Sequence, residues 1–137
     1  MDLEIIKKYS ILSPYDVSRE TCVDFENFIS MIIEENTKIN LISRKIRENK
    51  EIRHRHIIDS AQIIDFIDLN TNTTCDLGSG GGMPGIVIAI MFKKIKKDMK
   101  IQLYEKSYNK SMFLKEVSKK LNLNTKVIQK DISEVKN

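Results

Sequence analysis

The segment with the clearest capacity for chemistry is a cluster of glycines in residues 76–85. All five glycines of the chain lie there, in the sequence Asp-Leu-Gly-Ser-Gly-Gly-Gly-Met-Pro-Gly. Glycine accepts the positive φ of a sharp turn, and its missing side chain lets a ligand approach the backbone. A helix that follows such a turn offers free N–H groups and the positive end of its dipole. The cluster therefore predicts a ligand-binding loop between a strand and a helix.

Two classes of ligand fit this loop. Residues 80–85 match the dinucleotide fingerprint G-x-G-x-x-G, and Glu105 lies 20 residues beyond, where an acid would bind a ribose hydroxyl. A second frame, Asp76-x-Gly78-x-Gly80-x-Gly82, resembles the first motif of class I S-adenosylmethionine-dependent methyltransferases. S-adenosylmethionine carries a sulfonium and an ammonium group but no phosphate, so the Asp76 carboxylate suits it and would repel a pyrophosphate. The loop favours S-adenosylmethionine, with a nucleotide such as NAD as the alternative.

The elements around the loop alternate between strands and helices. Residues 73–77, 100–105 and 126–129 are predicted strands, and residues 84–92 and 107–121 are predicted helices. Helical crossovers between strands imply a parallel sheet. Before residue 70 we predict helices at 2–9, at 15–39 after Ser13-Pro14, and at 47–67. The predicted fold class is therefore α/β, with an N-terminal helical region (1–70) and the first half, β-α-β-α-β, of a Rossmann-like methyltransferase sheet (71–137). The two regions are expected to form one integrated domain.

Basic residues concentrate in two segments, although the formal net charge is only +4. Between residues 44 and 56, six Lys and Arg residues stand against two acids, and residues 93–100 contain five Lys and one Asp. Such segments on an otherwise slightly acidic chain indicate an anionic macromolecule as partner. The second segment is predicted to be a solvated Lys-rich loop. In the helix at 47–67 we expect the arginines to face outward and Ile52, His56, Ile63, Ile64 and Ile67 to face inward. Phosphate contacts are predicted for Arg44, Lys45, Arg47, Arg53 and Arg55.

Composition excludes several classes of protein. Charged residues interrupt every apolar run before 18 residues, so no transmembrane helix is expected. Cys22 and Cys75 are too few for a disulfide framework, and no spacing of His and Cys suggests a metal site. The N-terminus lacks the features of a signal peptide. We therefore expect a cytoplasmic protein with no metal and no membrane partner.

Three motifs together resemble one bacterial family. Residues 40–43 read Asn-Leu-Ile-Ser, residues 55–60 read Arg-His-Ile-Ile-Asp-Ser, and the glycine loop ends in Met-Pro-Gly. Over about residues 20–135 the chain resembles the RsmG (GidB) family. The resemblance implies S-adenosylmethionine-dependent methylation of N7 of a guanine in small-subunit ribosomal RNA, with that RNA or the small ribosomal subunit as partner.

The resemblance also implies positions for the cofactor. Gly78 and Met83 match loop positions that touch it, Glu105 matches the acid at the ribose, and Ile132 and Ser133 match the pair near the adenine. With Asp76, Gly80 and Gly82 from the loop motif, these residues form the predicted cofactor site. No catalytic residue is assigned, because guanine N7 carries no proton and its methylation needs no general base. His56 and Asp59 are therefore predicted to be structural or RNA-orienting, rather than an acid/base pair.

The chain departs from the family pattern in two ways. The loop after the third strand usually carries an Arg in the family, whereas this chain has Asp131 beside Lys130, and Lys does not replace a bidentate Arg. Only three of the usual seven strands are present, so the strand at 73–77 is expected to have an unpaired side. We expect a truncated gene product, an incomplete piece, or half of a split gene whose second polypeptide completes the sheet. The alternative functions are a nucleotide-dependent oxidoreductase fragment and a non-catalytic, vestigial RNA-binding protein. The early stop and Asp131 favour the non-catalytic, vestigial RNA-binding protein.

Overall fold

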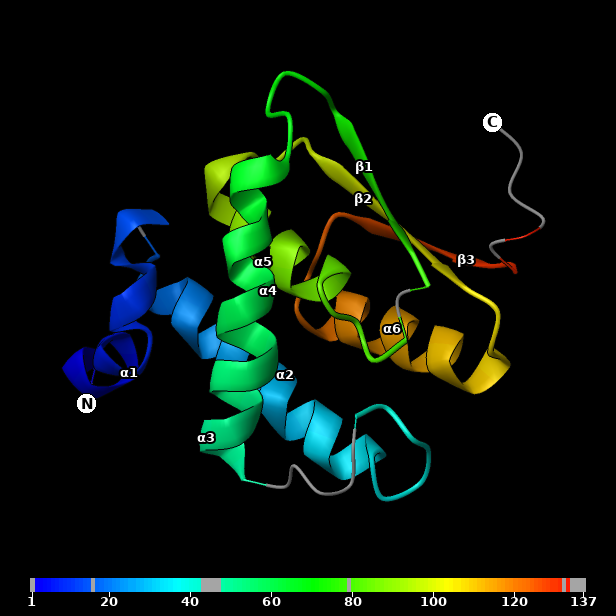
Figure 1. Cartoon of the computed structure of the whole chain (residues 1–137), viewed down its shortest axis with the longest axis horizontal. Helices are drawn as coiled ribbons and strands as arrows, with labels where there is room; N and C mark the ends of the chain where they lie inside the picture. The colour runs from blue at the N-terminus through cyan, green and yellow to red at the C-terminus, as the bar shows by residue number, and fades with distance from the viewer. Residues whose placement is uncertain (1, 16, 43–47, 79, 132, 134–137) are drawn as a thin grey trace.

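Helices make up the first half of the chain, and a three-stranded sheet with two helices makes up the second (Figure 1). The structure is a computed structural model, and it describes residues 2–15, 17–42, 48–78, 80–131 and 133. This arrangement confirms the predicted α/β class with helices ahead of a partial Rossmann-like sheet.

The N-terminal part contains α1 (Asp2–Lys8), a 3-10 helix η1 (Ser10–Tyr15) and the long helix α2 (Arg19–Glu35). α2 begins after Ser18, whose Oγ accepts a hydrogen bond from the N–H of Thr21 at 3.2 Å. This cap fixes the helix start. The predicted start near residue 15 was therefore wrong, and Pro14 lies inside η1 instead.

A second helical run covers residues 49–66. It consists of α3 (Asn49–Ile52), a π-helix η2 (Arg53–Ile58), α4 (Asp59–Ala61) and a 3-10 helix η3 (Gln62–Phe66). The wider π turn changes which side chains face inward, because its backbone hydrogen bonds follow an i→i+5 pattern. Two expectations for this run were wrong: Ile63 is 40% exposed and Arg53 is buried.

The sheet consists of β1 (Thr73–Leu77), β2 (Lys100–Glu105) and β3 (Thr125–Gln129), all parallel and in that spatial order. The crossovers are α5 (Gly85–Ile95) and α6 (Tyr108–Lys120), which confirms the predicted β-α-β-α-β order. Within the described chain β1 pairs only with β2, which leaves its other side free, as expected. Cys75 and Leu77 are exposed because they point to the face of the sheet away from α5. The carboxyl ends of the three strands share one edge of the sheet, where the glycine loop begins.

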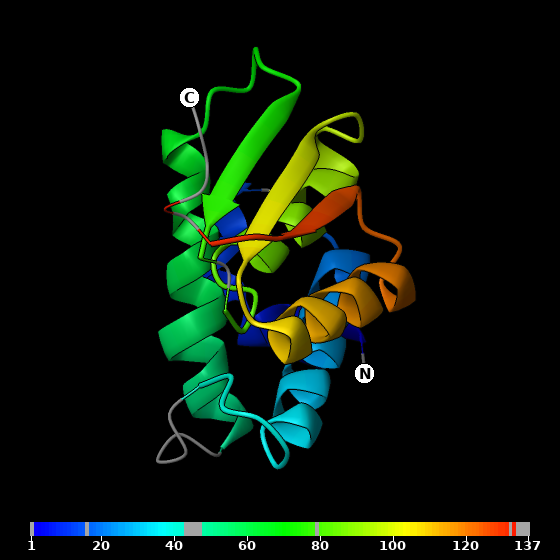
Figure 2. The ribbon, with the colours of Figure 1, turned by 90° about the vertical axis from the view of Figure 1, so that its right-hand side faces the viewer.

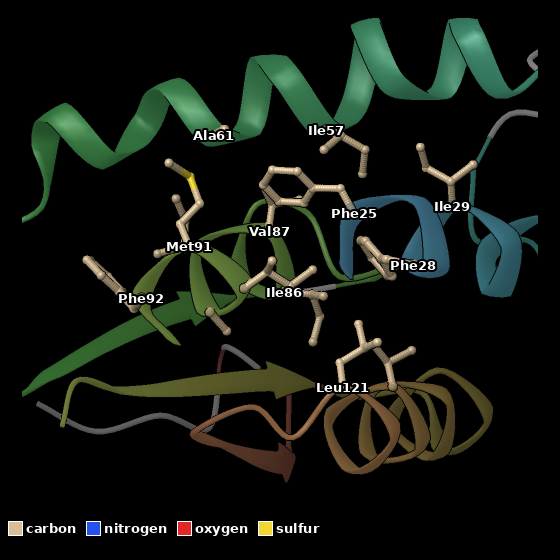
Figure 3. Close-up of a cluster of buried hydrophobic side chains, with 14 of the residues drawn as sticks. Phe25, Phe28, Ile29, Ile57, Ala61, Ile86, Val87, Met91, Phe92 and Leu121 are labelled. Carbon is tan, nitrogen blue, oxygen red and sulfur yellow. The ribbon is translucent and has the colours of Figure 1, made fainter. Parts of the chain in front are cut away.

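α5 lies at the centre of the molecule, between the sheet and the N-terminal helices (Figures 2 and 3). Every residue from Gly85 to Phe92 is buried, as its nearly all-round apolar sequence predicted. Phe25 and Phe28 of α2, with Ile57 and Ala61 of the second helical run, belong to the same core cluster (Figure 3). The glycine loop, which leads into α5, is therefore held from both halves of the chain.

None of the helices in the part of the chain that the structure describes is long and apolar enough to cross a membrane.

Candidate functional site

The glycine loop joins the end of β1 to the start of α5. Gly78, Gly80 and Gly82 have φ values of 79°, 52° and 97°, in the left-handed region that favours glycine. A Cβ on Gly82 would lie 2.7 Å from Cγ1 of Ile86 and 3.1 Å from Cζ of Phe28, so the core packs directly against this position. Among the described residues, the nearest atom that a Cβ on Gly80 would meet is the Gly78 carbonyl oxygen at 4.0 Å. The loop is thus packed at Gly82 and open at Gly80.

Asp76 and Gly85 fix the entrance to α5. The Gly85 N–H donates to Oδ2 of Asp76 at 3.0 Å, so the carboxylate supports the first turn of the helix. A Cβ on Gly85 would overlap the side chains of Leu103 and Asp76. Glycine at this position therefore lets α5 pack close to the sheet.

Glu105 ties the loop to the start of α6. Its side chain is at the end of β2 and only 7% exposed. Oε1 accepts the N–H of Gly80 at 2.9 Å, and Oε2 accepts the N–H of Ser107 at 2.6 Å. A carboxylate has about four lone-pair sites, so the two donors that the described residues supply leave each oxygen with capacity for a further donor. The structure therefore places the predicted ribose acid directly beside the predicted loop.

A pocket of about 230 Å³ opens at this edge of the sheet. Residues from the glycine loop, from both sides of the β2–α6 junction and from the end of β3 line it: Gly78, Tyr104, Glu105, Lys106, Ser107, Lys110, Lys130 and Asp131. Two of the predicted cofactor residues, Gly78 and Glu105, thus meet in one cavity. We call it the edge pocket.

The remaining predicted cofactor residues that the structure describes do not line the edge pocket: Asp76, Gly80, Gly82, Met83 and Ser133. Ile132 lies outside the described residues, as does Ser79 within the loop. Ser133 is exposed, and both its N–H and its hydroxyl bond to Oδ1 of Asp131 at 3.0 Å. These bonds, the backbone one first, hold the pKa of Asp131 below its usual value. Met83 is half-buried against the core and is not among the residues that line this pocket.

Comparison with known proteins identifies the family. The family model described as rRNA small subunit methyltransferase G matches residues 21–137. The chain belongs to this family. Among relatives carrying the name ribosomal RNA small subunit methyltransferase G, the protein of Pelagibacter ubique is 56% identical over 96% of this chain, and that of Bartonella henselae is 44% identical over 98%. The protein of Cereibacter sphaeroides is 35% identical over 87% of the chain.

The chain spans 62% of the length of the Pelagibacter and Bartonella proteins and 57% of the Cereibacter protein. The predicted resemblance to the RsmG family is confirmed, and so is the partial methyltransferase fold. Membership of a methyltransferase family implies a methyl donor and gives no support to the oxidoreductase alternative.

Leu41, in the motif at residues 40–43, lies against the glycine loop. Oδ1 of Asn36 accepts the N–H groups of Leu41 and Ile42 at 2.9 and 3.2 Å, which turns the chain sharply after α2. A Cβ on Gly81 would lie 3.0 Å from the carbonyl oxygen of Leu41. Gly81 is thus needed for close packing between the two segments. The unbroken run of glycines at residues 80–82 was the signal for this close packing, although Gly81 was not among the predicted site residues.

The predicted phosphate-binding residues divide into three groups. Arg44, Lys45 and Arg47 lie outside the described residues, and Arg55 is exposed. Arg53 is only 7% exposed, and its Nε and Nη2 donate to the two carboxylate oxygens of Glu26 at 2.9 and 2.8 Å. Its guanidinium also lies over the ring of Tyr9, 5.7 Å from the centroid. Arg53 therefore joins the second helical run to α2 and does not present its charge to an external phosphate.

The buried charges around Glu26 stabilise one another. Burial raises the pKa of the Glu26 carboxyl, but hydrogen bonds from Arg53 and Tyr9 outweigh it, so the net pKa is below its usual value. The hydroxyl of Tyr9 donates to Oε2 of Glu26 at 2.5 Å. Burial, and then this bond, raise the pKa of Tyr9. The bidentate pair fixes the position of the π-helix that carries Arg55 and His56.

The second basic segment is partly used inside the protein. Lys93 forms an ion pair with Asp24 at 2.8 Å and donates to the carbonyl oxygen of Leu121 at 2.6 Å. The ammonium of Lys96 donates to the carbonyl oxygens of Leu69 and Thr71. Lys94 and Lys100 are exposed. The prediction of a solvated loop was therefore wrong for Lys93 and Lys96.

His56 is half-buried on the π-helix. Among the described residues its Nε2 has no hydrogen-bond partner. Burial lowers the pKa of the ring, and the charge of Asp59 opposes this. Burial therefore favours the neutral form of the ring. No group of three His, Cys, Asp or Glu side chains able to hold a metal ion occurs in the described ranges.

Proposed function

We propose that this chain binds S-adenosylmethionine in the edge pocket and takes part in methylating N7 of a guanine in small-subunit ribosomal RNA. The observation that carries the proposal is the position of Glu105. A buried carboxylate at the end of β2 reaches the N–H of Gly80 in the loop and lines the same pocket as Gly78. The family supplies the reaction class.

The residues present suit this cofactor better than a dinucleotide. Glu105 keeps lone pairs that would accept ribose hydroxyls, and the space beside Gly80 would admit a ligand to the backbone. Asp76 adds a second carboxylate to the strand end that precedes the loop. Two carboxylates at this edge favour the positively charged end of S-adenosylmethionine and disfavour a pyrophosphate.

The protein's contribution to the reaction would be orientation and electrostatics. Bound S-adenosylmethionine supplies a methyl group attached to a positively charged sulfur. Guanine N7 has a lone pair and no proton, so no residue has to remove a proton for the transfer. Glu105 and the glycine loop would hold the methyl donor in a fixed position. Holding the donor and the guanine in the right geometry would accelerate methyl transfer. Asp131, which replaces the Arg usual in the family, would act by shaping the turn at Ser133.

The RNA would reach this edge over the surface that carries Arg55, with Arg44, Lys45 and Arg47 as further phosphate contacts. This role follows from the density of positive charge between residues 44 and 56. A ribosomal RNA substrate would place the protein in the cytoplasm.

The first test is thermal unfolding of the chain with equal concentrations of S-adenosylmethionine or NAD. A ligand at 100 times its Kd stabilises the folded state by about 2.7 kcal/mol. We expect S-adenosylmethionine to raise the unfolding temperature and NAD to leave it unchanged. Stabilisation by NAD alone would contradict the proposal, and RNA binding without any cofactor effect would support the non-catalytic alternative.

A further inference from the structure

A groove separate from the edge pocket runs along the outer face of α6. It has a volume of about 560 Å³ and lies between α6 and the C-terminal end of α2 with the loop that follows. Its apolar lining includes Ile39, Met112 and Phe113, and its basic lining is Lys38, Lys115 and Lys119. Tyr108 stands at one end. We call it the α6 groove.

The α6 side of the groove is a stripe along one helix face. Tyr108, Met112, Lys115 and Lys119 follow one another at intervals of four, three and four residues, which brings them to the same side of a helix. Tyr108 is 62% exposed and Met112 is 45% exposed. An aromatic ring and a thioether thus face solvent at the N-terminal end of the stripe, and two cations follow about 10 and 16 Å along the helix axis.

The charge of the α6 groove is net positive. Among the described residues, Lys38, Lys115 and Lys119 form no ion pair with a carboxylate. Of the two acids in the lining, Glu116 is paired with Lys120 at 3.0 Å, which leaves Glu35 as the opposing charge. A surface that combines an exposed aromatic face with spare lysines suits an unstacked base with its phosphates.

The α6 groove begins where the edge pocket ends. Ser107 and Lys110 line the edge pocket, whereas Tyr108 and Asn109, between them in the chain, line the groove. On the other side, Lys38 belongs to the segment that turns toward Leu41 and the glycine loop, and Figures 1 and 2 show this segment beside α6. A nucleic-acid strand lying in the α6 groove would therefore reach the edge pocket without crossing another helix or β-strand.

We propose that the α6 groove binds single-stranded RNA next to the methylated guanine, with a base stacked on Tyr108 and phosphates at Lys115 and Lys119. This inference rests on the proposed function, because it assigns to the same reaction a second contact surface for its RNA. Single-stranded RNA is favoured over a duplex, since an exposed aromatic ring needs an unstacked base as its partner.

The test is fluorescence anisotropy of a labelled single-stranded RNA, and of a duplex of equal length, titrated with the full chain at several salt concentrations. Tyr108→Ala should weaken single-strand binding by about 5- to 150-fold, the range for loss of one stacked base. Tyr108→Phe should restore binding, because it keeps the ring. Replacing Lys115 and Lys119 together by Gln should lower the salt slope by about 1.4 units.

The matched control is the Lys94→Gln and Lys100→Gln double variant, which removes the same charge from exposed positions at the opposite edge of the sheet. It should leave the salt slope nearly unchanged. Equal RNA affinity of the parent, the Tyr108→Ala variant and the double Lys115/Lys119 variant would overturn the groove assignment while leaving the proposed function intact. A preference for the duplex would also overturn it. If the parent binds no RNA but is stabilised by S-adenosylmethionine, the RNA role fails and the cofactor site stands.

Discussion

Gly80→Asn is expected to lower the affinity for S-adenosylmethionine by about 100-fold, or 2.8 kcal/mol. Gly80 has a φ of 52°, and a Cβ there would have free space around it among the residues that the structure describes. Asn tolerates the left-handed region better than other residues with a side chain, so the loop should keep its conformation. The side chain would then occupy the space where the cofactor is proposed to meet the backbone. Isothermal titration measures the loss, and the unfolding temperature without ligand reports whether the fold is kept.

Asn122→Gly provides the matched control. Asn122 has a φ of 54° and lies after α6, outside the edge pocket, so this variant makes the reverse exchange at another left-handed position. Its affinity for S-adenosylmethionine should equal that of the parent. Undiminished binding by Gly80→Asn, with both variants folded, would show that the cofactor does not approach the loop at this residue.

Arg53→Gln is expected to destabilise the fold by about 3 kcal/mol, because it leaves the largely buried Glu26 carboxylate with only the half-exposed Lys8 ammonium, at 3.6 Å, as a cation. The two side chains are largely buried, with exposed fractions of 8% for Arg53 and 21% for Glu26. This energy is a large fraction of the 5–15 kcal/mol that typically holds a domain together. Urea unfolding measures it. Arg55→Gln, two residues away on the exposed surface, should change stability by less than about 0.5 kcal/mol.

The same pair should make stability fall in acid. The pKa of Glu26 is lower in the folded protein than in the unfolded chain, where it is near 4.5. The pair's contribution is therefore fully present above about pH 4.5 and is lost as the pH falls through the folded pKa. Arg53→Gln should lose much of this acid sensitivity. The two variants should differ in the opposite sense in RNA binding. Arg55→Gln should lower the salt slope of RNA binding by about one unit, whereas Arg53→Gln should not. Equal stabilities of the two variants would contradict the structural role of Arg53.

Local sequence signals were sufficient for the sheet and its loop. The β-branched run at residues 73–77, the glycines that follow it and the acid at the end of the second strand predicted β1, the turn and the position of Glu105. These features depend on short-range chemistry: strand propensity, positive φ and the common edge of parallel strands. The contact between Gly80 and Glu105 joins residues that two predicted elements bring to that edge.

Features that depend on distant partners were not predictable in the same way. Arg53 faces inward because Glu26, 27 residues earlier in the chain, binds it, and because a π turn shifts the helical repeat there. An amphipathic pattern assigns every charged side chain to the solvent. Likewise, the start of α2 depends on a hydrogen bond from Thr21 to Ser18, while Ser13-Pro14 offered an equally plausible local signal.

The most direct test of the cofactor site is an NMR titration of the isotope-labelled chain with S-adenosylmethionine, followed through its backbone amide signals. The amide protons of Gly80 and Ser107 bind the two oxygens of Glu105, so a ligand that donates hydrogen bonds to this carboxylate must change both signals. We expect the largest shifts at Gly78, Gly80, Ser107 and Asp131, and little change at Lys94, Met99 and Asn122 at the opposite edge of the sheet. Shifts confined to that opposite edge, or a saturated complex in which Gly80 and Ser107 do not move, would contradict the assignment of the glycine loop and Glu105 to the cofactor.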